Sequence, residues 1–336
     1  MDDPAGPPPT DRIATLLREG ARGEAVERLD AVRTASTEER RATLRSLRTL
    51  AGERPGAVGP VGSALTPFLE DDERSVRLTA AKLFVALAAA TPEAVVPAVS
   101  SLAARLADED EFYYVRARSA EALGYVALER PDAVDDPDIL ADLRVGLSFD
   151  EPEVREKLAK ALECVALGDP GRLRHQVSSL AEHLDDGNEL VRYHLATALV
   201  AIGCAYPERL APVRDALVGR LDDENAHVRG RAAEALGLLA RDGRDDDAPR
   251  DALAQVADVE EEPFVAERVR FALDSTGRSE AAAVPDAVGS RGGVRETTAA
   301  AVDAITSPDG DGECRHCGLA LPEGAPPMCP RCGAPI

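Results

Sequence analysis

Residues 221–240 read LDDENAHVRGRAAEALGLLA, and this stretch carries the unit that recurs along most of the chain. Its central valine belongs to a series of six valines separated by 39, 39, 37, 37 and 37 residues. The reference valines are Val76, Val115, Val154, Val191, Val228 and Val265, and arginine follows each of the first five. A period of this length indicates stacked supersecondary units, none of which buries its apolar face alone. The sequence therefore predicts an extended binding surface more than a catalytic pocket.

Apolar residues follow each reference valine at the spacing of one buried helical face. After Val228 they are Ala233, Leu236 and Leu239, at offsets of five, eight and eleven residues. Aromatic residues make up only 3% of the chain and Trp is absent, so close contact between helices must rely on Ala, Leu and Val. Sixteen residues after the reference valine stand Pro92, Pro131, Pro170 and Pro207. Because proline is tolerated in the first turn of a helix, each proline is expected to begin the first helix of the next hairpin.

The first helix of each hairpin is expected to end in a Leu-x-Asp turn. The turns are Leu69/Asp71, Leu106/Asp108, Leu184/Asp186 and Leu221/Asp223. The third unit departs from this pattern, with Leu147, Phe149 and then Asp150. We expect the acids to cap free N–H groups at the start of the following helix and to lie near the arginine after the reference valine.

These patterns predict an all-α protein, an α-solenoid of about seven helical hairpins over residues 11–277. The acidic, proline-rich residues 1–10 are expected to be disordered. Residues 278–312 are rich in Ala, Gly, Ser, Pro and Asp, which predicts a flexible linker with a short helix over 294–305. A small zinc ribbon is expected at 313–336.

The repeat unit resembles that of the HEAT family, specifically the short bacterial and archaeal type related to phycobilisome-lyase repeats. The Leu-x-Asp turn, the Val-Arg pair, the Ala-Leu run and the proline between units all match, over roughly four-fifths of the chain. The resemblance implies an α-solenoid in which the aspartate and arginine form a structural ladder along the array. It says little about function, because solenoids have many unrelated roles.

The chain is strongly acidic, with a net charge of −22, which argues against nucleic-acid and anionic-membrane partners. Only three of its 39 basic residues are lysines. Such a surface suits a halophile, because concentrated salt screens the repulsion; a basic partner is the alternative. No segment is apolar enough for a membrane helix and the N-terminus lacks the regions of a secretory signal, so a cytoplasmic protein is expected. We also expect the protein to be a monomer.

Four of the six cysteines form two Cys-x-x-Cys pairs that are separated by eleven residues. They are Cys314, Cys317, Cys329 and Cys332. Two such pairs complete the tetrahedral sulfur shell that zinc favours, and four protein thiolates leave no position for a catalytic water. The segment resembles the short zinc ribbons of prokaryotic proteins, and we expect it to hold one structural Zn²⁺; redox dithiols and an iron centre are the alternatives. Because Arg315 and Arg331 are its only basic side chains and it has no aromatic residue, a protein contact is favoured over nucleic acid.

Two groups of residues are candidates for binding a partner. The third position after the reference valine forms a basic column, Arg118, Lys157, His194, Arg231 and Arg268, which could recognise an acidic partner. Alternatively, these residues pair with neighbours three positions on, as Arg118 can with Glu121 and Arg231 with Glu234. The second group is aromatic: Phe112, Tyr113, Tyr114 and Tyr193. If exposed, these rings are interface anchors; otherwise they fill space at an enlarged turn.

No catalytic constellation stands out in the sequence. Some HEAT-like proteins are enzymes, among them deoxyhypusine hydroxylase, with a di-iron site on His-Glu dipeptides, and phycobilin lyases. None of the five histidines here is followed by glutamate. The sequence therefore favours a non-enzymatic protein-interaction scaffold or adaptor, with the zinc ribbon as a second contact module. The alternative is a lyase-like or oxidoreductase-like enzyme, or an enzyme accessory, with a ligand in the concave groove.

Overall fold

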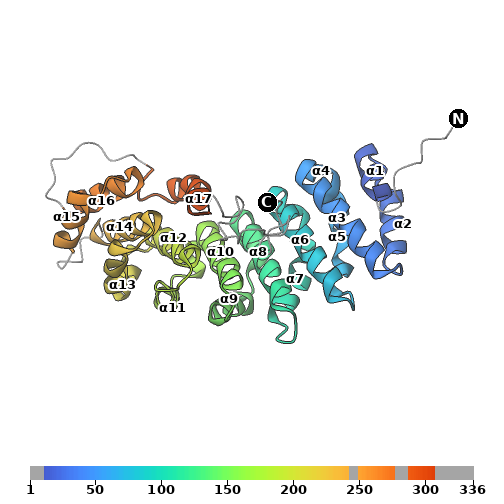
Figure 1. The fold of residues 1–336 in the computed structure, drawn as a ribbon, viewed down its shortest axis with the longest axis horizontal. Coiled ribbons are helices and arrows are strands. Elements are labelled where there is room, and N and C mark those ends of the chain that lie inside the picture. Colours follow the sequence, from blue (N-terminus) through green and yellow to red (C-terminus); the bar gives the residue numbers. More distant parts are fainter. Residues whose placement is uncertain (1–10, 242–248, 277–286, 307–336) are drawn as a thin grey trace, which may run out of the picture. The chain divides into compact units, whose positions relative to one another are not determined.

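The computed structural model describes residues 11–241, 249–276 and 287–306. These residues divide between Arg172 and Leu173 into two compact units, which we call unit 1 and unit 2. Within the described ranges every element is an α-helix or a 3₁₀-helix, so the all-α prediction is confirmed (Figure 1). Each unit stacks helical hairpins in the manner of an α-solenoid.

Seven long helices are the second members of the hairpins, as the repeat count predicts. In unit 1 they are α3 (Thr37–Glu53), α6 (Arg74–Ala90), α8 (Tyr113–Glu129) and α10 (Pro152–Gly168). In unit 2 they are α12 (Glu189–Ala205), α14 (Ala226–Arg241) and α16 (Pro263–Ser275). All six reference valines have no exposed surface, which confirms the predicted buried face.

The first helices of the hairpins are shorter and more broken than the sequence predicts. They comprise α1 (Arg12–Glu19), α2 (Arg22–Val32), α4 (Pro55–Val58), η2 (Gly59–Val61), α5 (Gly62–Leu65), η3 (Thr66–Glu70), η4 (Pro92–Ala94), η5 (Val96–Ala98), α7 (Val99–Ala107), η6 (Pro131–Val134), α9 (Pro137–Val145), η7 (Gly146–Ser148), η8 (Pro170–Arg172), α11 (Val177–Ala181), η9 (Pro207–Val213), α13 (Arg214–Gly219), η10 (Arg220–Asp222) and α15 (Arg250–Val259).

Prolines explain much of this segmentation. The predicted starts at Pro92, Pro131 and Pro207 are confirmed, because each stands in the first turn of a helical segment. A second proline then follows in several units, such as Pro212 inside η9. It removes an N–H donor and clashes with the preceding turn, so 3₁₀ turns replace a continuous α-helix. The first hairpin is divided instead at Gly20, whose φ of 81° ends α1.

Small residues bring the long helices of each unit together. A Cβ placed on Gly124 of α8 would lie 2.7 Å from the Cα of Ala161 in α10. One placed on Gly237 of α14 would lie 2.9 Å from the Cα of Ala272 in α16. At such separations there is no room for a larger side chain, so the helix backbones nearly touch.

A ladder of arginines and carboxylates connects neighbouring repeats within each unit. Arg192 donates from Nη1 to the carbonyl oxygen of Asp186, in the turn of its own repeat, at 2.8 Å. Its Nε donates to Oδ2 of Asp223, in the turn of the next repeat, also at 2.8 Å. Arg229 repeats both contacts one unit later, to the carbonyl oxygen of Asp223 and to Glu260. The ladder implied by the family resemblance is therefore present.

The turn acids act differently from the helix caps that the sequence predicts. Oδ1 of Asp223 accepts the N–H of Asn225 at 3.0 Å, two residues on and still inside the turn. Asn225 then accepts the N–H of His227, in the first turn of α14. The aspartate therefore closes the turn and receives the arginine of the preceding repeat, because it stands too far before the helix to reach its free N–H groups.

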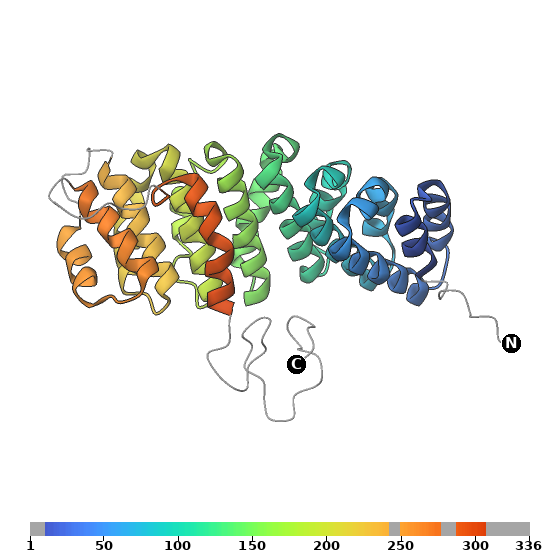
Figure 2. The same cartoon turned by 90° about the horizontal axis from the view of Figure 1, so that it is seen from above.

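Unit 2 contains one further helix, α17 (Arg291–Thr306), which packs against α12 (Figure 2). The sequence predicts a short helix over 294–305 within a flexible linker. The predicted helix is therefore present, with bounds of 291–306 in place of 294–305, and it is docked on unit 2 instead of standing free in a linker. The physical reason is the apolar stripe of this helix, which α12 and α14 cover.

Candidate functional site

The arginine ladder changes its partners at the start of α8. The turn before α8 is two residues longer than that before α14, because Val115 stands nine positions after Leu106, whereas Val228 stands only seven after Leu221. The insertion replaces the expected Asp108 with Glu111 as the acid that Arg77 contacts.

Glu111 is buried and holds Arg77 tightly. Nε of Arg77 donates to Oε2 of Glu111 at 2.6 Å, and its Nη2 donates to Oε1 at 2.9 Å. Burial by itself would raise the pKa of Glu111, but hydrogen bonds from Arg77 and from the Phe112 N–H outweigh it and hold the pKa below its usual value. Asp108 instead lies 3.2 Å from Arg105.

The next arginine, Arg116, has an aromatic ring where other repeats have an acid. Its Nε donates to the carbonyl oxygen of Leu106 at 2.8 Å, and its guanidinium carbon lies 4.7 Å from the centre of the Phe149 ring. Phe149 occupies the acid position of the Leu-x-Asp turn in the third unit. A cation–π contact therefore replaces the ion pair at this step of the ladder.

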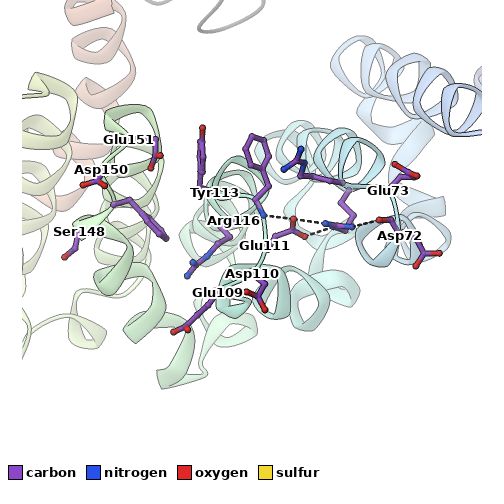
Figure 3. A pocket seen from close by; sticks show the side chains of 14 residues that line it. Asp72, Glu73, Glu109, Asp110, Glu111, Tyr113, Arg116, Ser148, Asp150 and Glu151 are labelled. Carbon is purple, nitrogen blue, oxygen red and sulfur yellow. Dashed lines mark hydrogen bonds and ion pairs between the residues drawn. The ribbon is translucent and has the colours of Figure 1, made fainter.

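A cavity of about 830 Å³ opens in unit 1 where these changes occur. Its lining comes from three successive turns, at residues 72–77, 109–116 and 148–151 (Figure 3). Three arginines line it together with seven carboxyl side chains. The acids are Asp72, Glu73, Glu109, Asp110, Glu111, Asp150 and Glu151. Since Glu111 already binds Arg77, the other six carboxylates give the cavity its negative potential.

The predicted aromatic cluster borders this cavity. Phe112 and Tyr113 line it, and both are partly exposed. The rings of Phe112, Tyr113 and Tyr114 have centroids 4.6 to 5.3 Å apart, and Arg74 lies over the Phe112 ring at 4.6 Å. The Tyr114 hydroxyl donates to Glu153 at 3.5 Å. Burial, followed by the charge of Glu153, raises the pKa of Tyr114, so the phenol keeps its proton.

In unit 1 the predicted basic column consists of Arg118 and Lys157, and both residues converge on one buried acid. Arg118 pairs with Glu121 at 2.6 Å, which confirms the alternative of pairing three residues on. Lys157 lies 4.0 Å from Glu121 and 2.6 Å from Glu156. Lys160, which stands outside the basic column and which no repeat pattern singles out, donates from Nζ to Glu121 at 3.1 Å and to the hydroxyl of Tyr125 at 2.6 Å.

In unit 2 the column is buried, which corrects the prediction of an exposed basic stripe there. His194, Arg231 and Arg268 are only 1%, 0% and 3% exposed. Glu234 pairs with Arg231 at 2.8 Å and with Arg268 at 3.0 Å.

Tyr193 is also fully buried, so it is not an exposed anchor. The cause is tertiary: α17 lies on this face of the unit and covers it (Figure 2). Two side chains that are 108 residues apart in the chain, Tyr193 and Ala301, thereby belong to one cluster.

The four cysteines of the predicted zinc ribbon, Cys314, Cys317, Cys329 and Cys332, lie outside the described residues. Within the described ranges, no three His, Cys, Asp or Glu side chains are grouped so as to hold a metal ion. Of the other two cysteines, Cys164 is buried and Cys204 partly so. Burial, with the nearby Glu234, raises the pKa of the Cys204 thiol to about 12.

The described part of the chain contains no helix with both the length and the apolar character needed to cross a membrane.

Comparisons with solved structures find repeat proteins. An engineered protein from the Northeast Structural Genomics Consortium is 20% identical with a TM-score of 0.62, over 89% of this chain and 84% of that one. A designed armadillo repeat protein is 19% identical with a TM-score of 0.56, over 64% of this chain and 99% of that one. Another, solved in complex with the peptide (KR)4, is 20% identical with a TM-score of 0.57, over 64% and 98%. At these identities the likeness concerns the fold alone.

No curated protein matches the sequence. The family model of HEAT repeats matches residues 99–199 and 177–274, which together make up more than half of the chain. With the hairpins, the buried valines and the arginine ladder, this match shows that the chain belongs to the HEAT repeat family.

Proposed function

We propose that this protein is a non-enzymatic interaction scaffold whose unit 1 binds a basic segment of a protein partner. The observation that carries the proposal is the cavity of unit 1, where six carboxylates without the Arg77 contact surround partly exposed aromatic rings. A cationic side chain gains from both groups, because carboxylates accept its hydrogen bonds and aromatic faces attract its charge.

The arrangement of the acids suits an extended peptide. Asp72, Asp110 and Asp150 belong to three successive turns, and all three are exposed. A peptide crossing these turns would meet a carboxylate at each repeat. The complex of a designed armadillo repeat protein with (KR)4 supports a Lys/Arg peptide as the ligand class for this fold.

The test is fluorescence anisotropy with a labelled (KR)4 peptide and the full chain. We expect the double variant Asp110→Asn/Asp150→Asn to bind about tenfold more weakly, because it removes two carboxylates of the cavity. The matched control is Glu19→Gln/Glu27→Gln, which changes the net charge equally at exposed positions of unit 1. Equal losses for the two variants would show only a general attraction to an acidic protein and would refute the site.

The predicted zinc ribbon is a second proposal about the same scaffold. Its support is the spacing of Cys314, Cys317, Cys329 and Cys332, which suits one tetrahedral structural zinc ion. Metal analysis should find about one zinc per chain, lost in Cys314→Ser/Cys317→Ser. A coloured iron centre, or a thiol count that shows a disulfide, would contradict the proposal.

Three finer interpretations also remain proposals. The acidic, lysine-poor composition supports a halophilic adaptation, so the binding assay should be repeated in molar salt. Because salt screens long-range attraction more than direct contacts, the affinity of a peptide bound in the cavity should fall less than that of a peptide held only by the net charge of the chain. The pairing of four cysteines in Cys-x-x-Cys motifs supports a cytoplasmic location. A bound chromophore or a metal-loaded repeat array would instead favour the lyase-like or oxidoreductase-like function.

A further inference from the structure

Helix α17 buries few of its residues against unit 2. Only Gly293, Val294 and Ala301 are buried among its sixteen residues, whereas α12 beneath it buries fourteen of seventeen. Ala301 packs with Tyr193 and Val228, and Val302 and Ile305 lie partly buried against that cluster. Helices that bury this little apolar surface open at lower free energy than the core.

The face beneath α17 is shaped to receive a helix. Nη2 of Arg231 donates to the carbonyl oxygen of Val294 at 3.1 Å and to Oγ1 of Thr297 at 2.9 Å. Oε1 of Glu234 accepts the N–H of Gly289, just before the helix, at 2.8 Å. The fully buried Arg231 and Glu234 thus contact the start of α17 and a residue just before it. The apolar contacts of Ala301 and Ile305 lie nearer the end of the helix.

These polar groups carry their own partners without α17. Glu234 pairs with both Arg231 and Arg268, and Arg231 also donates to the hydroxyl of Tyr193 at 3.3 Å, so each charged side chain beneath the helix keeps a partner when α17 leaves. The contacts that Arg231 and Glu234 make to α17 and to the residue before it are to backbone groups and to one hydroxyl. Any helix with a small apolar stripe and a serine or threonine at the matching position could make them.

We propose that α17 is an internal ligand of unit 2, seated on a helix-binding face of α12 and α14 from which an amphipathic helix of a protein partner displaces it. The partner helix presents small or β-branched apolar residues at the positions of Val294, Ala301 and Ile305, and a hydroxyl at that of Thr297. This mode of recognition differs from the basic-peptide site of unit 1. If the helix-binding face of unit 2 is disproved, the basic-peptide site of unit 1 is unaffected. If the basic-peptide site is disproved, the helix-binding face is likewise unaffected.

The face can be tested with α17 itself as the probe. A labelled peptide of residues 287–306 is titrated with the full chain, with Ala301→Glu and with Ala300→Glu. Ala301 is buried and Ala300 is exposed on the same helix, so the two variants differ only in which face carries the new charge. Covalent attachment gives α17 a millimolar effective concentration, and its release removes that competitor.

We expect Ala301→Glu to bind the peptide at least about tenfold more tightly than the unmodified chain. Ala300→Glu is expected to match the unmodified chain. Equal affinities for all three proteins would overturn the proposal.

If Ala301→Glu unfolds unit 2, hydrogen exchange on the unmodified chain tests independently whether α17 opens without the rest of unit 2. We expect the amides of α17 to exchange through a local opening, well before those of α12. Exchange of α17 and α12 in a single cooperative event would show that α17 is a fixed part of the core and would refute the proposal.

Discussion

Replacing Glu121 with Gln should destabilise unit 1 in a pH-dependent way. Glu121 is 5% exposed and lies within 4.0 Å of Arg118, Lys157 and Lys160. Burial by itself would raise the pKa of this carboxyl, but the charges of the three bases outweigh it and lower the pKa from 4.5 to about 2. The carboxylate is therefore stabilised by folding.

The magnitude follows from the difference between the two pKa values. At about 1.4 kcal/mol per pKa unit, the ionised Glu121 contributes roughly 3 kcal/mol to the free energy of unfolding at pH 7. Because the folded-state pKa is the lower one, the unfolded chain binds more protons in acid. The contribution is thus complete above about pH 5, falls to roughly 1.4 kcal/mol at pH 3 and vanishes below pH 2.

Urea unfolding followed by circular dichroism, at pH 7, 5, 4 and 3, measures this contribution. Hydrogen exchange of the α8 amides assigns the affected transition to unit 1. The control is Glu93→Gln, because Glu93 pairs with Arg130 at 3.2 Å at the surface, where such a pair contributes less than about 1 kcal/mol. A difference between Glu121→Gln and the unmodified chain that is small at pH 7, or that stays constant down to pH 3, would show that the ionised carboxylate does not stabilise unit 1.

Three further predictions concern packing, the ladder and a thiol. Gly124→Ala should lower the melting temperature of unit 1, because its Cβ would meet α10. Gly52→Ala is the control: Gly52 has open space around it, so this variant should raise the free energy of unfolding by about 0.5–1 kcal/mol. Arg192→Leu should cost about 2 kcal/mol in urea unfolding, since it removes both hydrogen bonds of Arg192 to the buried carboxylate of Asp223 and leaves Arg220, at 3.4 Å, as its paired cation. A loss well below about 1 kcal/mol would count against a stabilising ladder. With its pKa raised to about 12, Cys204 should resist iodoacetamide at pH 8 until the chain is unfolded, and rapid labelling of the folded protein would disprove its burial.

Parts of the candidate site were visible in the sequence, but their relation was not. The inserted aromatics Phe112, Tyr113 and Tyr114 stand out in a chain with so few rings, and Phe149 departs visibly from the Leu-x-Asp turn. The carboxylates of the cavity could not be singled out among 61 acidic residues. Their meeting depends on three turns that lie side by side only after the hairpins stack.

The buried column of unit 2 illustrates the same limit. Matching offsets in the sequence place Arg231 and Arg268 on the same face of successive helices, and a helix can be read in the residues that become α17. Nothing local to either segment shows that one covers the other, because Arg231 and Val294 are 63 residues apart.

The hairpins, their number and their buried valines could be predicted from the repeat pattern, because helical periodicity and proline positions are set within one repeat or between adjacent repeats. The exposure of the charged side chains could not be predicted in this way, because it depends on every segment of the folded chain that packs against a helix face. Stacking made Glu111 and Phe149 the partners of Arg77 and Arg116, and the docking of α17 covered the predicted basic column of unit 2, where Arg231 pairs with Glu234.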